Sequence, residues 1–226
     1  MVHFFYGETR DEIIENTSLE KYIQIQFQEA LKYRNEIETI AVIRDGIDEG
    51  RFLKVVEEEV QAIKTAAKNL GIDAKFVVFL INKKTNARHF QINKESNIIT
   101  SMPPRSFISF GTRYMFKQIF MTAHRSITGT AVNTLITLPH DEIGISKAEG
   151  QEFLLGLCYL HQVVNAPISI PTSLHQADEI AFRGQYLYRK MYPPYKNYER
   201  EKLGNDELTR LLNFGDSLIP GTRYNA

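Results

Sequence analysis

The feature that most constrains the fold is an apolar run, Thr39–Arg44, which stops abruptly at Asp45-Gly46. Its mostly β-branched residues predict a strand buried on both faces. From Arg51 to Leu70 apolar side chains recur every three or four residues, which predicts a helix. A second apolar run, Lys75–Ile81, predicts another strand. The two strands should be parallel neighbours, because a helical crossover of this length normally returns to the same sheet.

Asp45 therefore falls at the carboxyl end of a parallel strand, which is where open α/β sheets place their ligands. On the residues alone two interpretations stay open. Asp-Gly after a strand is common turn chemistry, and the same carboxylate could equally serve a site. Asp48, just before the helix, is placed to cap it.

The other elements follow from the same patterns. They are helices over residues 12–31, 146–164 and 174–190 and strands over residues 114–122 and 132–138. Glu12 is expected in the first turn of its helix, where it favours the dipole. Two capping boxes, Ser146-x-x-Glu149 and Ser173-x-x-Gln176, open the last two helices. The acidic run 57–59 is expected on a solvated helix face.

The formal net charge is zero, but the charges are unevenly spread. Residues 1–73 carry nine basic and fifteen acidic side chains, whereas residues 74–140 carry nine basic and one acidic. The nine cations are Lys75, Lys83, Lys84, Arg88, Lys94, Arg105, Arg113, Lys117 and Arg125. They predict either a phosphate-binding surface or a solvated basic face balanced by acids folded nearby.

The chain of 226 residues is expected to form one domain, since no linker, repeat or low-complexity tract divides it. No apolar stretch has membrane-spanning length, and we expect no membrane partner. Cys158 is the only cysteine, which excludes a disulfide within the chain. Its apolar neighbours predict a buried structural thiol rather than a nucleophile.

Several blocks together carry a resemblance to a known family. Arg44-Asp45-Gly46-x-x-Glu49-Gly50-x-Phe52 resembles a segment of the PIWI domain of Argonaute proteins. Further similar blocks, in the family's order, are residues 10–14, 124–130, 157–158, 169–171 and 181–183. The resemblance implies a partial PIWI domain over residues 1–226. Its fold would be α/β and ribonuclease H-like, with a mixed sheet, helices on both faces and the amino-terminal strands missing.

The resemblance also implies a set of catalytic positions. Nuclease-active members use an Asp-Glu-Asp-Asp or an Asp-Glu-Asp-His set around two divalent ions. Asp45 matches the third position, Glu12 the second and Asp178 the fourth, so Asp45 and Asp178 are the implied metal ligands for Mg²⁺ or Mn²⁺. Their carboxylates are expected to converge. The first aspartate has no match before Glu12, so we expect no cleavage from this chain.

The family's RNA contacts match better. Lys83, Lys84 and Arg88 correspond to cations on the guide backbone. The other implied contacts are His124 on the backbone, Ser169 and His175 on guide phosphates, Arg183 near the 5′ phosphate and Ala226 as the carboxyl terminus that completes the phosphate pocket. Without the resemblance, Ser169 and Ser173 are read as simple capping residues. Val132, Val163 and Ala166 stand where animal Argonautes often have arginine.

The resemblance thus implies a guide small-RNA binding module of RNA-mediated silencing. Its expected partners are guide RNA, complementary target RNA and silencing proteins, in the cytoplasm or the nucleus. Two alternatives stay open. One is a metal-dependent endoribonuclease that uses Asp45, Asp178 and Glu12. The other is a protein-interaction module independent of RNA, which the zero net charge fits.

Overall fold

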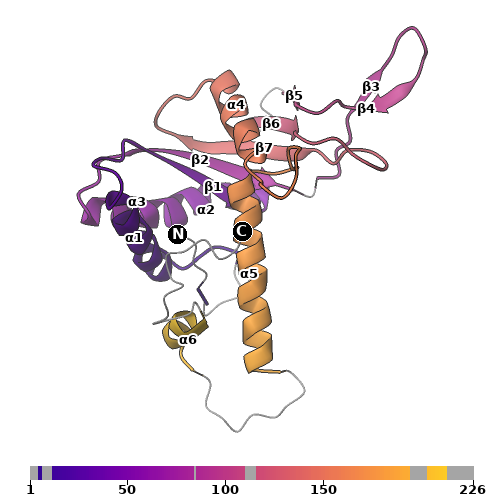
Figure 1. Ribbon diagram of the computed structural model, residues 1–226. Coiled ribbons are helices and arrows are strands. Elements are labelled where there is room, and N and C mark those ends of the chain that lie inside the picture. Colours follow the sequence, from indigo (N-terminus) through magenta and orange to yellow (C-terminus); the bar gives the residue numbers. More distant parts are fainter. Residues whose placement is uncertain (1–4, 7–11, 84, 110–115, 194–202, 213–226) are drawn as a thin grey trace. The chain divides into compact units, whose positions relative to one another are not determined.

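The computed structural model describes residues 5–6, 12–83, 85–109, 116–193 and 203–212 (Figure 1). The chain forms two compact units. The first, termed the sheet unit, comprises residues 38–56 and 74–175; the second, termed the helical unit, comprises residues 1–37, 57–73 and 176–226. Among the described helices, none combines the length and the apolar character that crossing a membrane requires.

The sheet unit contains a mixed five-stranded sheet in the order β1-β2-β7-β6-β5 (Figure 1). Its strands are β1 (Thr39–Asp45), β2 (Lys75–Asn82), β5 (Ser106–Ile108), β6 (Lys117–Thr122) and β7 (Thr134–Asp141). β1 and β2 are parallel, with Asp45 beside Ile81, and the other pairs are antiparallel. The predicted parallel pair is confirmed, and the strands predicted over residues 114–122 and 132–138 are found as β6 and β7.

A second, two-stranded sheet stands apart from the main one. It consists of β3 (Phe90–Ile92) and β4 (Ile99–Ser101), which form the hairpin at the upper right of Figure 1. Three of its apolar side chains, Phe90, Ile92 and Ile99, are exposed. A hairpin with no covered face contributes little stability, so the fold depends on the five-stranded sheet.

The core of the sheet unit lies between one face of the sheet and α4 (Lys147–Cys158). Phe79 of β2, Ile136 of β7 and Leu154 of α4 belong to it. Cys158 is fully buried there, and its thiol donates to the Leu154 carbonyl oxygen at 3.3 Å. The predicted burial of Cys158 is confirmed, and this burial raises the pKa of its thiol to about 12.

The sequence predicted capping boxes for two helices, and the structure confirms only one of them. The capping box of α4 is present: Ser146 accepts from the Glu149 amide, and Glu149 accepts from the Ser146 amide. The helix ends at Cys158 rather than near residue 164. The second predicted box is wrong, because α5 (Thr172–Met191) already includes Ser173. Pro171 precedes it, and a proline with its fixed φ is well suited to begin a helix.

A helical run connects β1 to β2 as predicted. It consists of η1 (Glu49–Arg51), α2 (Phe52–Val55), the π-helical turn η2 (Val56–Val60) and α3 (Gln61–Asn69). Asp48 occupies the N-cap position, but its side chain makes no capping hydrogen bond, so that expectation is corrected. The run begins in the sheet unit and ends in the helical unit.

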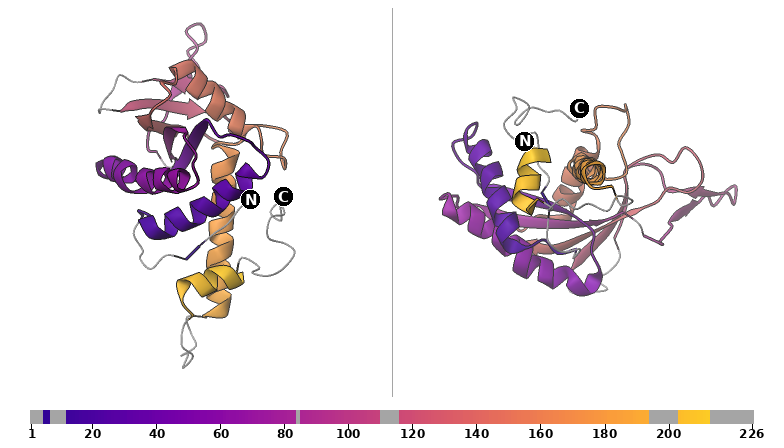
Figure 2. Two further views of the ribbon diagram at one scale, coloured as in Figure 1. Left: turned by 90° about the vertical axis from the view of Figure 1, so that its left-hand side faces the viewer. Right: turned by 90° about the horizontal axis from the view of Figure 1, so that it is seen from below.

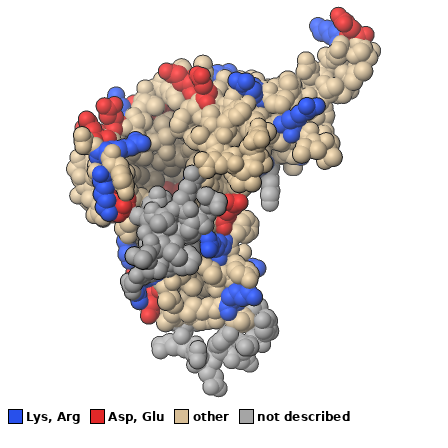
Figure 3. Space-filling view, viewed as in Figure 1, with Lys and Arg blue, Asp and Glu red and all other residues tan. Residues whose placement is uncertain are grey.

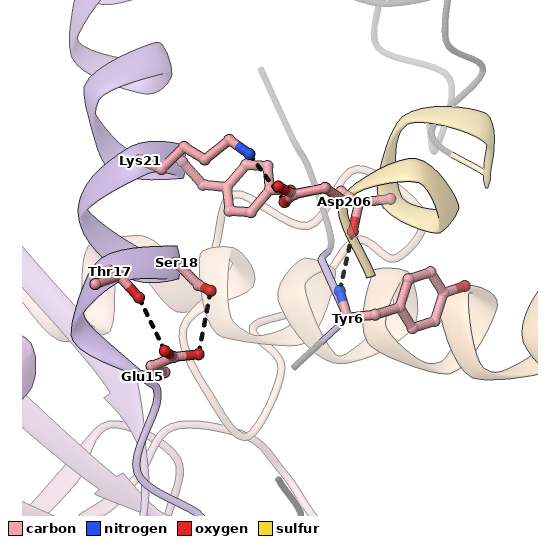
Figure 4. Close-up of polar contacts among 8 residues, drawn as sticks. Tyr6, Glu15, Thr17, Ser18, Lys21 and Asp206 are labelled. Atoms are coloured by element: carbon pink, nitrogen blue, oxygen red, sulfur yellow. Dashed lines mark hydrogen bonds and ion pairs between the residues drawn. The ribbon is translucent and has the colours of Figure 1, made fainter. Parts of the chain in front are cut away.

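In the helical unit α1 (Asn16–Leu31) packs along α3, and α6 (Asn205–Leu212) lies beside α1 (Figure 2). Lys21 of α1 is 2.8 Å from Asp206 of α6, and this ion pair lowers the pKa of Asp206 (Figure 4). The Tyr6 amide also reaches α6, where it donates to the Thr209 hydroxyl at 3.2 Å (Figure 4).

Two expectations for acidic residues of this unit are wrong. Glu12 precedes α1, which begins at Asn16, so Glu12 does not act on the dipole of that helix from its first turn. Glu59 is not solvated: it is 3% exposed, and its Oε1 accepts from the Ile14 amide at 3.1 Å. An acidic run predicts an exposed face only where every position of the helix faces water, and here the chain before α1 covers one of them.

Candidate nucleic-acid interface

Strand register brings several predicted site residues to one end of the five-stranded sheet. β1 ends at Asp45, β2 ends at Asn82 opposite the start of β7, and β6 ends at Thr122. The segments that follow these strands therefore leave the sheet at the same end, termed the Asp45 end. Ser169 joins them, because its carbonyl oxygen accepts from the Thr134 hydroxyl at 2.9 Å.

The carboxylate of Asp45 is engaged through both oxygens. Oδ1 accepts from the Gly46 amide at 2.9 Å, and Oδ2 lies 3.2 Å from the Lys83 ammonium. The Asp45 side chain is 49% exposed and that of Lys83 24%, so water screens the pair and its net attraction is modest. Lys83, predicted as a phosphate contact, is thus also the cation partner of the predicted metal ligand.

Gly46 allows β1 and β2 to come close at this end. An ideal Cβ on Gly46 would lie 2.1 Å from Asn82 Oδ1 and 2.9 Å from Asn82 Cα. Any larger side chain would push against the backbone of β2. The glycine after Asp45 therefore serves a close approach as well as the turn that the sequence indicated.

The residues from Lys83 to His89, termed the basic segment, follow β2. Arg88 is exposed, and its guanidinium donates to the carbonyl oxygens of Thr85 (2.6 Å) and Ala87 (2.9 Å). These bonds hold the arginine against its own segment. Lys84 lies outside the described residues.

A buried polar network, which the sequence analysis missed, holds the basic segment to the sheet. Its centre is Asn133, 1% exposed, whose Oδ1 accepts from the Thr122 hydroxyl at 2.6 Å. Asn133 Nδ2 contacts His89 Nδ1, and the Asn133 carbonyl oxygen accepts from the Thr85 hydroxyl at 3.0 Å. Its partners are distant in sequence, and a lone asparagine after a valine gives no signal of such a role.

The remaining site residues of the sheet unit lie near these segments in sequence and register. His124 follows β6 and is half-buried; burial lowers its pKa, so the ring is neutral at pH 7 and would meet a phosphate as a hydrogen-bond partner, not a cation. Ser169 contributes its carbonyl oxygen to the Thr134 contact. His175, in the first turn of α5, lies against His161 with ring centroids 4.8 Å apart.

Other predicted residues belong to the helical unit. Glu12 precedes α1, whereas Asp178 and Arg183 lie on α5. The expected convergence of the Asp45 and Asp178 carboxylates therefore stays a prediction. Ala226 lies outside the described residues.

The divalent ions that the resemblance implies find no ready site in the described part of the chain. No three His, Cys, Asp or Glu side chains gather there as a metal ion would require. At Asp45 itself the nearby charge is the Lys83 ammonium, which repels a cation. Asp178, the other implied ligand, belongs to the helical unit, so a shared metal site with Asp45 stays a prediction.

The visible charges are dispersed. On the face shown in Figure 3, lysines and arginines among the described residues stand apart and acidic side chains lie between them. Phosphate binding would therefore depend on the cations of individual segments, such as the basic segment.

Comparison with known proteins decides the family. A family model for the Piwi domain matches residues 2–189. The chain belongs to the Piwi domain family. Argonaute protein wago-4 of Caenorhabditis elegans is 26% identical over 219 residues, which cover 83% of this chain and 22% of that protein. The argonaute protein of Schizosaccharomyces pombe is 26% identical over 157 residues, which cover 68% of this chain and 19% of that protein.

Solved structures agree on the fold of this Piwi domain. Kluyveromyces polysporus Argonaute with a guide RNA matches with a TM-score of 0.79 and 19% identity, over 91% of this chain and 26% of that one. The C-terminal lobe of a budding yeast Argonaute matches with a TM-score of 0.78 and 19% identity, over 88% of this chain and 42% of that one. The predicted ribonuclease H-like fold class is confirmed. The chain spans about a fifth of the length of the curated relatives named above.

Proposed function

We propose that this Piwi domain binds the sugar-phosphate backbone of a small guide RNA and acts in RNA-mediated gene silencing. The observation that supports the proposal most is the register of the sheet. It places Asp45, the basic segment and His124 at one end, with Ser169 tied to the same end through Thr134. Lysine and arginine side chains and hydroxyl groups on neighbouring loops can contact successive phosphates of an RNA backbone.

Family membership supports the same ligand. The matched Kluyveromyces polysporus Argonaute holds a guide RNA, and another matched Argonaute, from Clostridium butyricum, holds a guide DNA and a target DNA. Lys83, Lys84 and Arg88 would supply charge along the guide backbone, and Arg183 and His175 would each contact a guide phosphate, as the family resemblance implies. The complementary target RNA would pair with the bound guide.

Salt dependence tests this proposal. The full chain is titrated with a 5′-phosphorylated single-stranded RNA at several salt concentrations, and the double variant K83A/K84A is compared with K147A. Lys147 begins α4, just after β7 leaves the sheet at the opposite end. We expect K83A/K84A to flatten the plot of log K against log salt by roughly two units, because two counterion-releasing contacts are lost.

K147A should leave the slope unchanged. If the double variant also leaves it unchanged, or if both variants change it equally, RNA binding at the Asp45 end is refuted. The protein-interaction alternative would then be favoured.

We further propose that this chain does not cleave RNA. A two-metal mechanism needs several carboxylates to hold the ions, and Asp45 is paired with Lys83 instead. The test incubates the chain with guide, complementary RNA and Mg²⁺ or Mn²⁺, beside Asp45→Ala. We expect no product from either protein. Product from the wild type that disappears in Asp45→Ala would establish the nuclease alternative with Asp45, Asp178 and Glu12.

A further inference from the structure

Asn133 contacts the basic segment at two points. Its carbonyl oxygen accepts from the Thr85 hydroxyl at 3.0 Å, and its side-chain amide contacts Nδ1 of His89. The amide is itself held by the hydroxyl of Thr122, the last residue of β6, at 2.6 Å. The buried end of the sheet thus fixes two residues of the segment that lie on either side of its exposed part.

The hydrogen bonds of Arg88 act differently. They run to the carbonyl oxygens of Thr85 and Ala87, so they shape the segment without tying it to the sheet. Arg88 and its neighbour Asn86 are exposed. The two contacts of Asn133 therefore help to set the orientation of the segment relative to the strands, together with the Lys83–Asp45 ion pair and the ring contact of His89 with Phe120.

We propose that Asn133 and His89 are positioning residues, which hold the basic segment so that Lys83 and Arg88 face phosphates of a single-stranded RNA. This inference rests on the function proposed above and names the residues that shape its interface. A segment fixed before binding loses less conformational freedom when the RNA arrives. The pair therefore raises affinity without touching the RNA.

The chemistry of the His89 ring supplies a matched pair of variants. Burial lowers the pKa of His89, so the neutral ring presents Nδ1 as an acceptor to the Asn133 amide. Asparagine can place its Oδ1 where Nδ1 stands and keep this hydrogen bond. Leucine fills similar space against Phe120, whose ring centroid is 4.8 Å from that of His89, but it offers no acceptor.

The experiment compares full-length wild type, H89L, H89N and T85V. Binding of a 5′-phosphorylated single-stranded RNA is measured across salt, and amide hydrogen exchange of residues 83–89 is followed without RNA. We expect H89L and T85V to bind about tenfold more weakly near 0.15 M salt, with a shallower slope, because about two phosphate contacts lose alignment. Exchange in the segment should accelerate in both variants, whereas H89N should resemble the wild type in every measurement.

Each of the other outcomes would count against either the inference or the proposed function. Wild-type affinity and slope in H89L, with faster exchange in the segment, would overturn the inference while the proposed function stands. Equal losses in H89L and H89N would also overturn it, since packing alone would then explain them. If H89L melts below the assay temperature, T85V decides, because it removes one hydroxyl from a half-buried position. A wild type that lacks a steep, Lys83- and Lys84-dependent salt slope refutes the proposed function first.

Discussion

Gly46→Ala is the sharpest test of the geometry at the Asp45 end. The new Cβ would lie 2.1 Å from Asn82 Oδ1, 2.5 Å from Asn82 Cγ and 2.9 Å from Asn82 Cα. The Asn82 side chain could rotate, but the Cα belongs to β2 and pairs opposite Leu135 of β7. Relief therefore requires β1 or β2 to shift at the point where Lys83 meets Asp45.

The expected cost follows from overpacking, which destabilises proteins by about 1–3 kcal/mol. In a chain of this size each kcal/mol lowers Tm by roughly 2–4 °C, so Gly46→Ala should melt about 2–12 °C below the wild type. The matched control is Gly50→Ala, four residues on, where a Cβ would meet nothing within 4 Å. Alanine in that helical turn should leave Tm unchanged or raise it slightly.

Thermal unfolding followed by circular dichroism measures both variants, and RNA titration then reports whether the Lys83 position has moved. The reasoning predicts a loss of stability and of RNA affinity for Gly46→Ala alone. Equal melting temperatures for the two variants would show that β1 and β2 do not approach each other this closely, and the placement of Lys83 beside Asp45 would lose its support.

Three further predictions concern single groups. Because burial raises the pKa of Cys158 to about 12, native protein at pH 8 should react with a thiol-alkylating reagent roughly a thousandfold more slowly than protein unfolded in urea; mass spectrometry reads the modification. Ser146→Ala should cost about 1 kcal/mol in urea unfolding. Hydrogen bonds from Ser146 lower the pKa of Glu149, so their stabilising effect is present at neutral pH and is lost as the pH falls through that lowered pKa. The stability difference between the wild type and Ser146→Ala should therefore narrow in acid without vanishing, because the cap bond from the Glu149 amide to the Ser146 hydroxyl does not depend on the charge of Glu149. Asp45→Asn removes a carboxylate charge beside the Lys83 ammonium, so RNA should bind a few-fold more tightly at low salt, and tighter binding that persists at high salt would contradict the electrostatic cause.

The parts of the fold that the sequence predicted are those set by local patterns. Two apolar runs separated by a helical period were enough to predict that β1 and β2 are parallel, because handedness leaves few other arrangements. The Ser146 box was predictable for the same reason, since both partners lie within one turn. At Ser173 the same pattern misled, because α5 already begins one residue earlier, at Thr172.

The parts that could not be predicted depend on contacts between distant residues. Asn133 meets His89 across 44 residues, and the two positions show no pattern that would pair them. Glu59 looks like one of three solvated acids until the amide of Ile14, 45 residues away, is seen to bind it. Such pairs form where two elements meet in the fold, so the residue pattern of either element alone does not predict them.

The distribution of charges shows that the place of a residue in the fold predicts its role better than its place in the sequence. Residues 74–140 carry nine basic and one acidic side chain, yet Lys75 and Lys117 begin their strands and so lie at the end of the sheet opposite Asp45. Lys117 is also 3.7 Å from Asp141, a carboxylate just outside that third of the sequence. At the Asp45 end the described cations on the connecting segments include Lys83, Arg88, Arg125 and Arg105, which stands just before the residue of β5 that pairs with Thr122, and Lys83 shares its charge with Asp45. The number of phosphates that this face can neutralise is therefore set by the few cations its loops carry, and the zero net charge of the chain does not argue against an RNA ligand.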